Sequence, residues 1–382
     1  MQVSFVESIT EVDAQTWNTL VSNESPFLKH EFLLALEQTG CTIRATGWQP
    51  HHAIVCHSEA DTSVVAVSPL YLKFNSFGEY VFDWSWADAF GKAGVNYYPK
   101  FLTAIPFTPC ASSRILHDEN VSQNAVLDAL KLAIQSVAEQ TGVSSWHVLF
   151  PTQAESEALG KHGMSRRKGC QFHWFNRGYQ DFDDYLQALN SRKRKNIRKE
   201  RRSVTGQGIQ FETIEGPDIT ERQWKHFYDF YQSTYLVRGR EGYLNQEFFL
   251  QVGRTMPKNL VLILAKVGSQ PIAGALFFKG GSRLYGRYWG SMEEYQFLHF
   301  ETCFYQGIDY CIRHGLQQFD AGAQGERKIQ RGFEPIETWS NHWISNANFS
   351  SAINDFLKQE SRYVGSYMAE AEKLLPFKKP SS

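Results

Sequence analysis

The sequence predicts a two-domain α/β protein in which each domain is a mixed sheet flanked by helices. The length of 382 residues fits two domains of about 100–200 residues each. A hairpin, an amphipathic helix and a further strand follow one another in the first half, and this order recurs in the second half. The hairpin pairs its strands antiparallel, and a crossover helix then adds a strand in parallel. The result is a mixed sheet with helices on its faces.

In the first half, residues 63–72 and the aromatic segment 80–86 read as the two strands of the hairpin. Apolar residues recur at helical spacing over 123–140, and this pattern ends near Gly142. Residues 145–150 then read as the next strand. These elements make up one predicted α/β unit.

In the second half, residues 260–267 and 271–279 read as strands, and 283–290 is an aromatic strand after a Gly-Gly turn. A helix is predicted over 298–314, followed by a strand over 316–321. The second half therefore repeats the order of the first.

Two landmarks keep the same spacing between the halves. Gly163 and Gly332 are 169 residues apart, and so are Trp174 and Trp343. This shared offset favours a duplicated domain, with chance coincidence in a Trp-rich chain as the alternative. We expect the domains to be 1–178 and 179–382, because a helix start at Asp181 follows Gly178.

Composition narrows the class of protein. Hydrophobic residues make up 42% and charged residues 21%, which excludes wholesale disorder. No transmembrane stretch and no secretory signal are recognised, so a cytoplasmic location is expected. The six Cys form no CxxC pair, so we predict reduced thiols and no metal site.

One segment is strongly basic. Residues 191–202 hold eight of the 39 Lys and Arg but only one of the 40 acids. A helix is expected from a Ser191 cap to Gly206, with Arg194, Lys195 and Arg198 as candidate anion-binding residues. A solvated face is the usual alternative, but so many uncompensated cations favour tRNA, CoA phosphates or an anionic lipid surface as a partner.

The run from 299 to 335 resembles the end of a FemAB-like, GNAT-related acyltransferase domain. The resemblance rests on a helix, a Gly, a strand ending in Asp320-x-Gly322, then Lys328 and Gly332-Phe333. It implies two tandem GNAT-like acyl-CoA N-acyltransferase domains. It also implies transfer of an acyl or aminoacyl group from acyl-CoA or aminoacyl-tRNA to a small-molecule or peptide amine, as in peptidoglycan synthesis, with no tightly bound cofactor.

The sequence departs from the GNAT pattern at the donor loop. That loop normally cradles a pyrophosphate with glycine-rich backbone N–H groups, but residues 291–302 contain no Gly. The alternative function is therefore a non-catalytic GNAT-like protein that binds an anionic polymer such as tRNA or a cell-wall precursor. A simple nucleic-acid-binding module is a third possibility, although no base-reading motif supports it.

Three residues are candidates for catalysis. Glu301 lies between Ile308 and Ile312 on the helical wheel, where desolvation would raise its pKa toward that of a general base. The alternative is an acid stabilised at a helix N-terminus. Asp320 closes a strand, where such folds place ligands, and Lys328 in the following loop could bind a phosphate or carboxylate.

Other side chains are candidates for substrate binding. On the aromatic strand, Tyr285 and Arg287 would share a face by the two-residue period. The remaining candidates are polar residues beside rings or in loops, each with a structural alternative as a core, capping or surface group: His299, Arg331, Asp83, Asp88, and Arg238 and Arg240 in a possible anion-binding lid.

Overall fold

The computed structural model describes residues 1–323 and 325–378, which form two compact units. Unit 1 comprises Met1–Cys170 and Glu337–Ser366, and unit 2 comprises Gln171–Ile336 and the chain from Tyr367 onward. The chain first crosses between units eight residues before the predicted boundary at 178, and the segment 337–366 returns to unit 1. No helix in the described part of the chain is long and apolar enough to cross a membrane.

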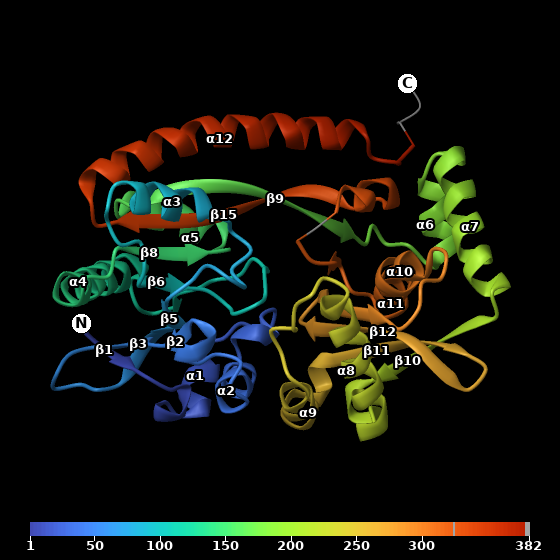
Figure 1. Cartoon of the computed structure of the whole chain (residues 1–382), viewed down its shortest axis with the longest axis horizontal. Coiled ribbons are helices and arrows are strands. Elements are labelled where there is room, and N and C mark those ends of the chain that lie inside the picture. Colours follow the sequence, from blue (N-terminus) through green and yellow to red (C-terminus); the bar gives the residue numbers. More distant parts are fainter. Residues whose placement is uncertain (324, 379–382) are drawn as a thin grey trace. The chain divides into compact units, whose positions relative to one another are not determined.

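Unit 1 has a mixed sheet and a smaller antiparallel sheet (Figure 1). In spatial order, the mixed sheet contains β2 (Trp48–Pro50), β5 (Leu70–Lys73), β6 (Lys100–Thr103), β8 (Ser145–Leu149) and β15 (Glu334–Ile344). The smaller sheet contains β1 (Gln2–Val6), β3 (His52–Cys56), β4 (Val64–Ser68) and β7 (Leu116–His117). Its helices are α1 (Ala14–Thr19), α2 (His30–Gln38), α3 (Trp84–Lys92), α4 (Gln123–Thr141) and α5 (Gln153–Lys161).

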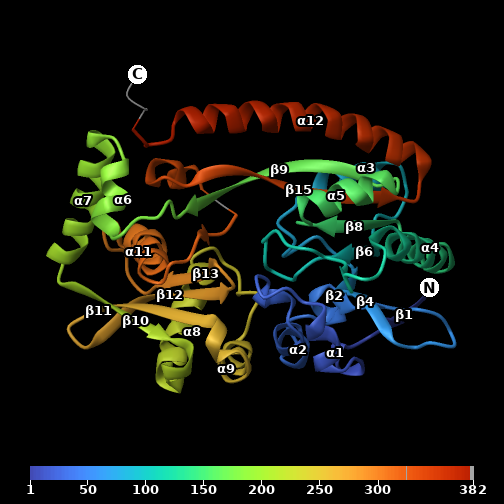
Figure 2. The ribbon, with the colours of Figure 1, turned by 180° about the vertical axis from the view of Figure 1, so that it is seen from behind.

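Unit 2 is built on one sheet with helices on both faces (Figures 1 and 2). Its strands, in spatial order, are β10 (Ile209–Glu215), β11 (Leu260–Val267), β12 (Gln270–Gly280), β13 (Arg283–Ser291), β14 (Gln318–Asp320) and β9 (Ser165–Phe175). The first part of β9, up to Cys170, belongs to unit 1. The helices are α6 (Phe182–Ala188), α7 (Ser191–Gly206), α8 (Glu221–Leu236), α9 (Gln246–Thr255), α10 (Leu298–Phe300) and α11 (Gln306–Arg313). The last helix, α12 (Ala347–Lys373), has residues in both units.

The strand order confirms the predicted duplication. From β2 to β15 in unit 1 and from β11 to β9 in unit 2, strand pairs run antiparallel, antiparallel, parallel and antiparallel. Strands β9 and β15 are offset by 169 residues at both ends. Trp174 lies opposite Phe319 on β14, and Trp343 lies opposite Trp146 on β8. The two landmarks therefore occupy equivalent places.

Most predicted elements are confirmed, but the hairpin over 63–86 is wrong. Its first strand is divided into β4 and β5, which belong to different sheets, and its second strand is the helix α3. Trp86 and Phe90, four residues apart, are buried, whereas Asp88 between them is exposed. Because Asp88 and Phe90 lie beyond the predicted strand 80–86, that segment by itself does not show the helical spacing.

The predicted helix over 298–314 is also interrupted. Residues Glu301–Tyr305 form a π-helical turn between α10 and α11. Such turns are rare in proteins, but those that occur are often found at functional sites. In the basic helix, the capping residue is Asn190 rather than Ser191, because the Asn190 side chain accepts a hydrogen bond from the backbone N–H of Lys193.

Gly290 on β13 allows α8 to lie directly against the sheet. A Cβ atom at Gly290 would lie 1.7 Å from the carbonyl oxygen of Phe230 on α8. Because backbone atoms cannot move as a side chain can, the helix or the strand would have to shift.

We expect Gly290→Ala to lower the free energy of unfolding by about 1–3 kcal/mol or more, as overpacking does. Gly206→Ala is the control, because a Cβ there meets no atom within 4 Å. Urea denaturation measures both variants. Equal stability of Gly290→Ala and the wild type would contradict the close approach.

Candidate active site

The site is centred on a buried ion pair at the end of β14. Arg287 Nη1 lies 3.1 Å from Asp320 Oδ1, and Arg287 Nη2 lies 2.5 Å from Asp320 Oδ2. Both side chains are 2% exposed. The backbone N–H of Gly322 also donates to Oδ1, at 2.8 Å. Asp320 therefore joins the sheet to the loop that follows it.

A β-bulge directs Arg287 to this pair. The pairing of β12 with β13 shifts register so that Arg287 is the extra residue between Gly286 and Tyr288. Bulges re-aim side chains and occur next to active sites. The recorded pairing of β13 with β14 ends at Tyr285 and Asp320, although β13 continues to Ser291. Tyr285, which was predicted to share a strand face with Arg287, lies close to it, with 5.2 Å between the guanidinium carbon and the ring centre.

Electrostatics keep Asp320 ionised. Burial by itself would raise the pKa of this carboxyl, but Arg287, His173 and the Gly322 N–H together hold it below its usual range. His173 on β9 lies 3.6 Å away, and burial lowers its pKa to about 4. Asp320 is therefore a bound anion next to a neutral imidazole. This arrangement is better suited to positioning than to accepting a proton.

Lys328 lies beside this pair. It is 2% exposed within a 3₁₀ turn, Glu326–Arg331, and its Nζ donates to the carbonyl oxygen of Gly322 at 2.5 Å. Burial, assisted by the charge of Arg287 and opposed by that of Asp320, lowers the pKa of Lys328 to about 8. A lysine with such a pKa can donate or release a proton near neutral pH.

The π-helical turn carries a second network. Glu301 is 3% exposed, and its carboxylate is bound by Arg201 of α7 at 3.0 Å and by Gln306 at 2.8 Å. The carboxylate is buried as predicted, but its oxygens already bind one cation, Arg201, and one amide, Gln306. It is therefore placed to hold α7 against the π-helical turn.

Arg331 is not a loop residue that waits for an anion. It is 6% exposed and pairs with Glu200 of α7 at 2.8 Å. Its Nε donates to the Tyr305 hydroxyl, and its guanidinium lies over the ring of Phe300. Both the predicted anion-binding role and the solvated-loop alternative placed it at the surface, whereas tertiary packing buries it.

The remaining candidates make no direct contact with the Arg287–Asp320 pair. His299 is exposed and packs edge-on against Trp289, with 5.3 Å between ring centres. Arg238 and Arg240 are exposed in the loop after α8. Asp88 is a surface residue paired with Lys92 at 2.6 Å. None of these four side chains has a recorded contact with Asp320 or Lys328.

Asp83 belongs to a separate buried cluster in unit 1. Its carboxylate accepts hydrogen bonds from Lys100 and from Tyr97, the latter at 2.6 Å. Lys100 also pairs with Glu79 at 2.8 Å and is fully buried. Asp83 precedes α3, but its side chain makes no capping hydrogen bond. Neither an exposed acceptor pocket nor a capping role describes it.

In α7, half of the basic side chains are engaged within unit 2. Arg194 donates to Gln187 at 2.6 Å, Arg198 pairs with Asp183 at 2.9 Å, and Arg201 pairs with Glu301. Lys193 donates to Gln330 at 2.9 Å. The other four are exposed, have no ion pair within the described residues, and recur every three or four positions on one helix face: Arg192, Lys195, Lys199 and Arg202.

Sequence reasoning missed several residues of these networks. His173 was visible only as part of the FHW segment, where Trp174 was the landmark. Glu200 and Arg201 were counted as part of a charge run. Their partners are about 100 residues or more away in sequence, and no local pattern indicates such contacts. Within the described residues, no group of three His, Cys, Asp or Glu side chains could hold a metal ion.

A family model described as peptidoglycan biosynthesis/recognition matches residues 8–379. The chain belongs to the FemAB-like family. Among solved structures, FemX has 14% identity and a TM-score of 0.54, covering 90% of this chain and 98% of its own. The C-terminal domain of a putative lysylphosphatidylglycerol synthetase from Agrobacterium fabrum has 11% identity and a TM-score of 0.53, covering 91% and 96%. No curated protein sequence matches.

These likenesses concern the fold. Together with the repeated strand order, they show a mixed α/β fold made of two tandem domains with the same strand arrangement, as expected from the sequence. The Arg287–Asp320 pair lies in the second of these domains.

We expect Arg287→Met to lower the free energy of unfolding by about 3–5 kcal/mol at pH 7, because it leaves a buried carboxylate unpaired. A double variant, Arg287→Met with Asp320→Leu, should lose less than the sum of the single variants.

The pH dependence of stability gives a second test. Because the folded pKa of Asp320 is depressed, its ionised form stabilises the wild type above the unfolded pKa of 3.8, and this stabilisation is lost as pH falls toward the folded pKa. The advantage of the wild type should therefore shrink below about pH 4 in urea titrations. Additive losses would show that the two residues are not coupled.

Proposed function

We propose that this FemAB-like protein transfers an aminoacyl or acyl group to an amine of a peptidoglycan precursor, in unit 2 at the end of β14. The observation that carries the proposal is the buried Lys328, with a pKa near 8, beside the Arg287–Asp320 pair. The family match supports the class of reaction.

The proposed reaction needs no covalent enzyme intermediate. The neutral acceptor amine attacks the carbonyl carbon of the donor ester or thioester, and a C–N bond forms. The C–O or C–S bond then breaks, the leaving ribose oxygen or thiol takes up a proton, and the amine gives up its proton. The protein must orient both substrates and stabilise negative charge on the carbonyl oxygen.

Lys328 is the catalytic residue in this proposal. Its protonated Nζ already donates to the carbonyl oxygen of Gly322. A donor carbonyl that replaced the Gly322 oxygen would receive the same hydrogen bond, which strengthens as charge develops on that oxygen. Asp320 acts as a positioning residue, because Arg287 and Gly322 occupy its oxygens. Glu301 acts in the same way through Arg201.

His299 is the residue that we propose to accept the amine proton. The residue reaches the surface, but its ring packs against Trp289 and Phe304. This desolvation, together with the charges of Arg331 and Lys328, lowers its pKa. The imidazole is therefore neutral at pH 7 and has a free electron pair for a proton. Tyr285 and Arg287 would define the edge of the acceptor site along β13, and Arg238 and Arg240 could contact an anionic acceptor from the loop after α8.

Removing the charge of Lys328 tests the proposed catalysis. We expect Lys328→Met to lower kcat by about 10²–10³-fold, the usual cost of losing one donor to the developing oxyanion. Wild-type kcat should also fall as pH rises above about 8, where Lys328 loses its proton, and the variant should lack this decline. Single-turnover transfer to a UDP-linked pentapeptide precursor measures both.

Arg327→Gln is the matched control for Lys328→Met, because Arg327 is an exposed cation on the same 3₁₀ turn. It should retain wild-type turnover within a factor of a few. Full activity of Lys328→Met would remove the residue from the mechanism. Binding of precursor without any transfer by the wild type would favour the recognition function instead.

The exposed cations of α7 lead us to propose aminoacyl-tRNA as the donor. Four cations on one face span about 15 Å at a rise of ~1.5 Å per residue. Ile197 and Val204, the apolar residues of α7, are buried, so this helix presents no large apolar side chain for insertion into a lipid surface. A phosphodiester backbone needs only the charges.

Neutralising the free face should weaken tRNA binding. We expect Arg192, Lys195, Lys199 and Arg202, all changed to Gln, to lower tRNA affinity at least tenfold at low salt. The slope of affinity against salt concentration should also become shallower, because fewer counterions are released. Fluorescence titration of labelled aminoacyl-tRNA over a salt series measures both.

The control changes two engaged cations, Arg194→Gln with Arg198→Gln, and should have a smaller effect on tRNA affinity. Acyl-CoA titrations on the same proteins provide the other donor. Unchanged tRNA affinity in the fourfold variant, or tight and salt-insensitive binding of acyl-CoA alone, would contradict tRNA as the donor.

A further inference from the structure

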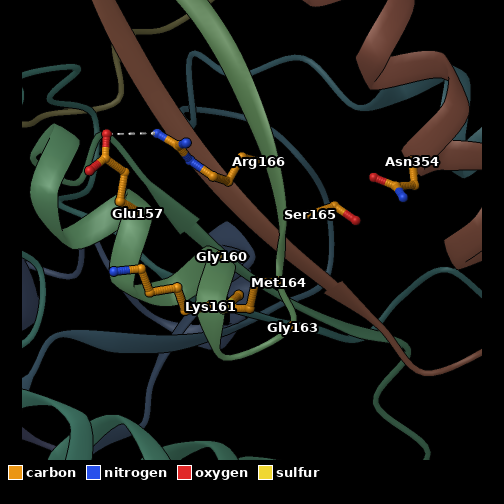
Figure 3. A pocket seen from close by; sticks show the side chains of 8 residues that line it. All are labelled: Glu157, Gly160, Lys161, Gly163, Met164, Ser165, Arg166 and Asn354. Carbon is orange, nitrogen blue, oxygen red and sulfur yellow. Dashed lines mark ion pairs between the residues drawn. The ribbon is translucent and has the colours of Figure 1, made fainter.

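Unit 1 contains an open pocket of about 710 Å³ that the proposed transfer reaction does not use. It lies where α5 ends, where Gly163 turns the chain and where β9 begins, and α12 contributes Asn354 (Figure 3). Its volume is within the range of small-molecule sites, about 300–1,000 Å³. Two cations line it, Lys161 and Arg166, together with a single acid, Glu157.

Arg166 is held in place by one hydrogen bond, one ring contact and a long ion pair. Its Nε donates to Ser156 Oγ at 3.1 Å, and its guanidinium lies over the ring of Trp339 at 4.2 Å. Figure 3 shows Glu157 pointing toward it, but the nearest nitrogen–oxygen distance is 3.8 Å. Within the described residues, Nε is the one guanidinium nitrogen with a hydrogen-bond partner. Because Nη2 is buried and faces Glu157, Nη1 is the guanidinium nitrogen that remains for a ligand.

Further positive charge surrounds the pocket. Lys161 is exposed and has no ion-pair partner among the described residues. The ammonium of Lys131 on α4 lies 3.5 Å from where a Cβ atom of Gly163 would be. Three neighbouring cations are paired with acids: Lys168 with Glu337, Arg167 with Glu360, and Lys358 with Asp355. Asp128 is hydrogen-bonded to His162, which carries a charge only when it is protonated. The named groups therefore leave an excess of positive charge.

The internal repeat shows that the fold does not require these cations. At the 169-residue offset, Lys161 corresponds to Gln330 and Arg166 corresponds to Pro335. Unit 2 has a pocket at the equivalent turn, lined by Ile329, Gln330 and residues of α12, but it measures about 310 Å³ and contains Lys193 as its cation. The cationic character is therefore specific to the pocket of unit 1.

We propose that this pocket binds a phosphate-bearing small molecule of about nucleotide size. Arg166 provides a charged donor at Nη1, and Lys161 and Lys131 provide point charges, and such a group of cations suits phosphate oxygens. Ser165 and Asn354 face one another across the pocket and offer neutral donors and acceptors to the rest of the ligand (Figure 3). The volume exceeds what a single inorganic phosphate fills, so an organic body is expected.

Isothermal titration of the full chain tests this site with three probes: pyrophosphate, ADP and glutarate. We expect saturable binding of pyrophosphate or ADP, and at least tenfold weaker binding in the variant Arg166→Gln with Lys161→Gln. Glutarate carries two negative charges but no phosphate, so it should bind less well. Absence of saturable binding by any probe, or equal binding of glutarate, would overturn the proposal.

Two further variants separate a built site from general charge attraction. Lys92→Gln removes an exposed charge of α3 outside the pocket lining and should leave binding unchanged. Gly160→Ala keeps every charge, but its Cβ would lie 2.8 Å from Arg166 Cδ, so the guanidinium must move and binding should weaken. Circular dichroism checks that each variant is folded. Equal losses in Lys92→Gln and the double variant, or full affinity in Gly160→Ala, would refute the site.

Discussion

The organisation of unit 2 depends on keeping the charge of Asp320 paired inside the protein. A carboxylate taken out of water is costly unless a cation and hydrogen-bond donors replace the lost solvation. Arg287 supplies the cation and Gly322 supplies a backbone donor. Because Gly322 also accepts the hydrogen bond of Lys328, one ion pair fixes the strand end, the loop and the lysine together. The proposed chemistry of Lys328 follows from this arrangement.

The π-helical turn and the basic helix extend the same principle outward. Arg201 of α7 binds Glu301 in the turn, and Glu200 binds Arg331 in the loop segment that also carries Lys328. Neighbouring residues of α7 thus hold two different elements around the site. The helix that presents free cations to solvent is therefore tied by ion pairs to the π-helical turn and to the turn that carries Lys328. In the proposed function, these ion pairs connect the donor-binding helix to that lysine.

The duplicated domains use equivalent positions for different chemistry. In unit 2, Asp320 and His173 lie opposite one another on β14 and β9. In unit 1, the facing pair on β8 and β15 is His147 and His342, whose Nδ1 atoms are 2.7 Å apart. Burial lowers the pKa of His147 to about 3, so that pair is neutral where unit 2 holds charge. The fold keeps a polar pair at this place in both units, but an arginine completes it only in unit 2.

The sequence by itself determined the repeat, the order of most strands and helices, and the residues of the 320–333 segment. These depend on local periodicity, turn residues and a fixed 169-residue offset, all of which can be read along the chain. Tertiary structure alone decided which charges meet. The bulge at Arg287 and the burial of Arg331 depend on partners distant in sequence. A charged side chain has no periodic pattern that reveals its partner, because pairing is set by the desolvation of both groups when the chain folds.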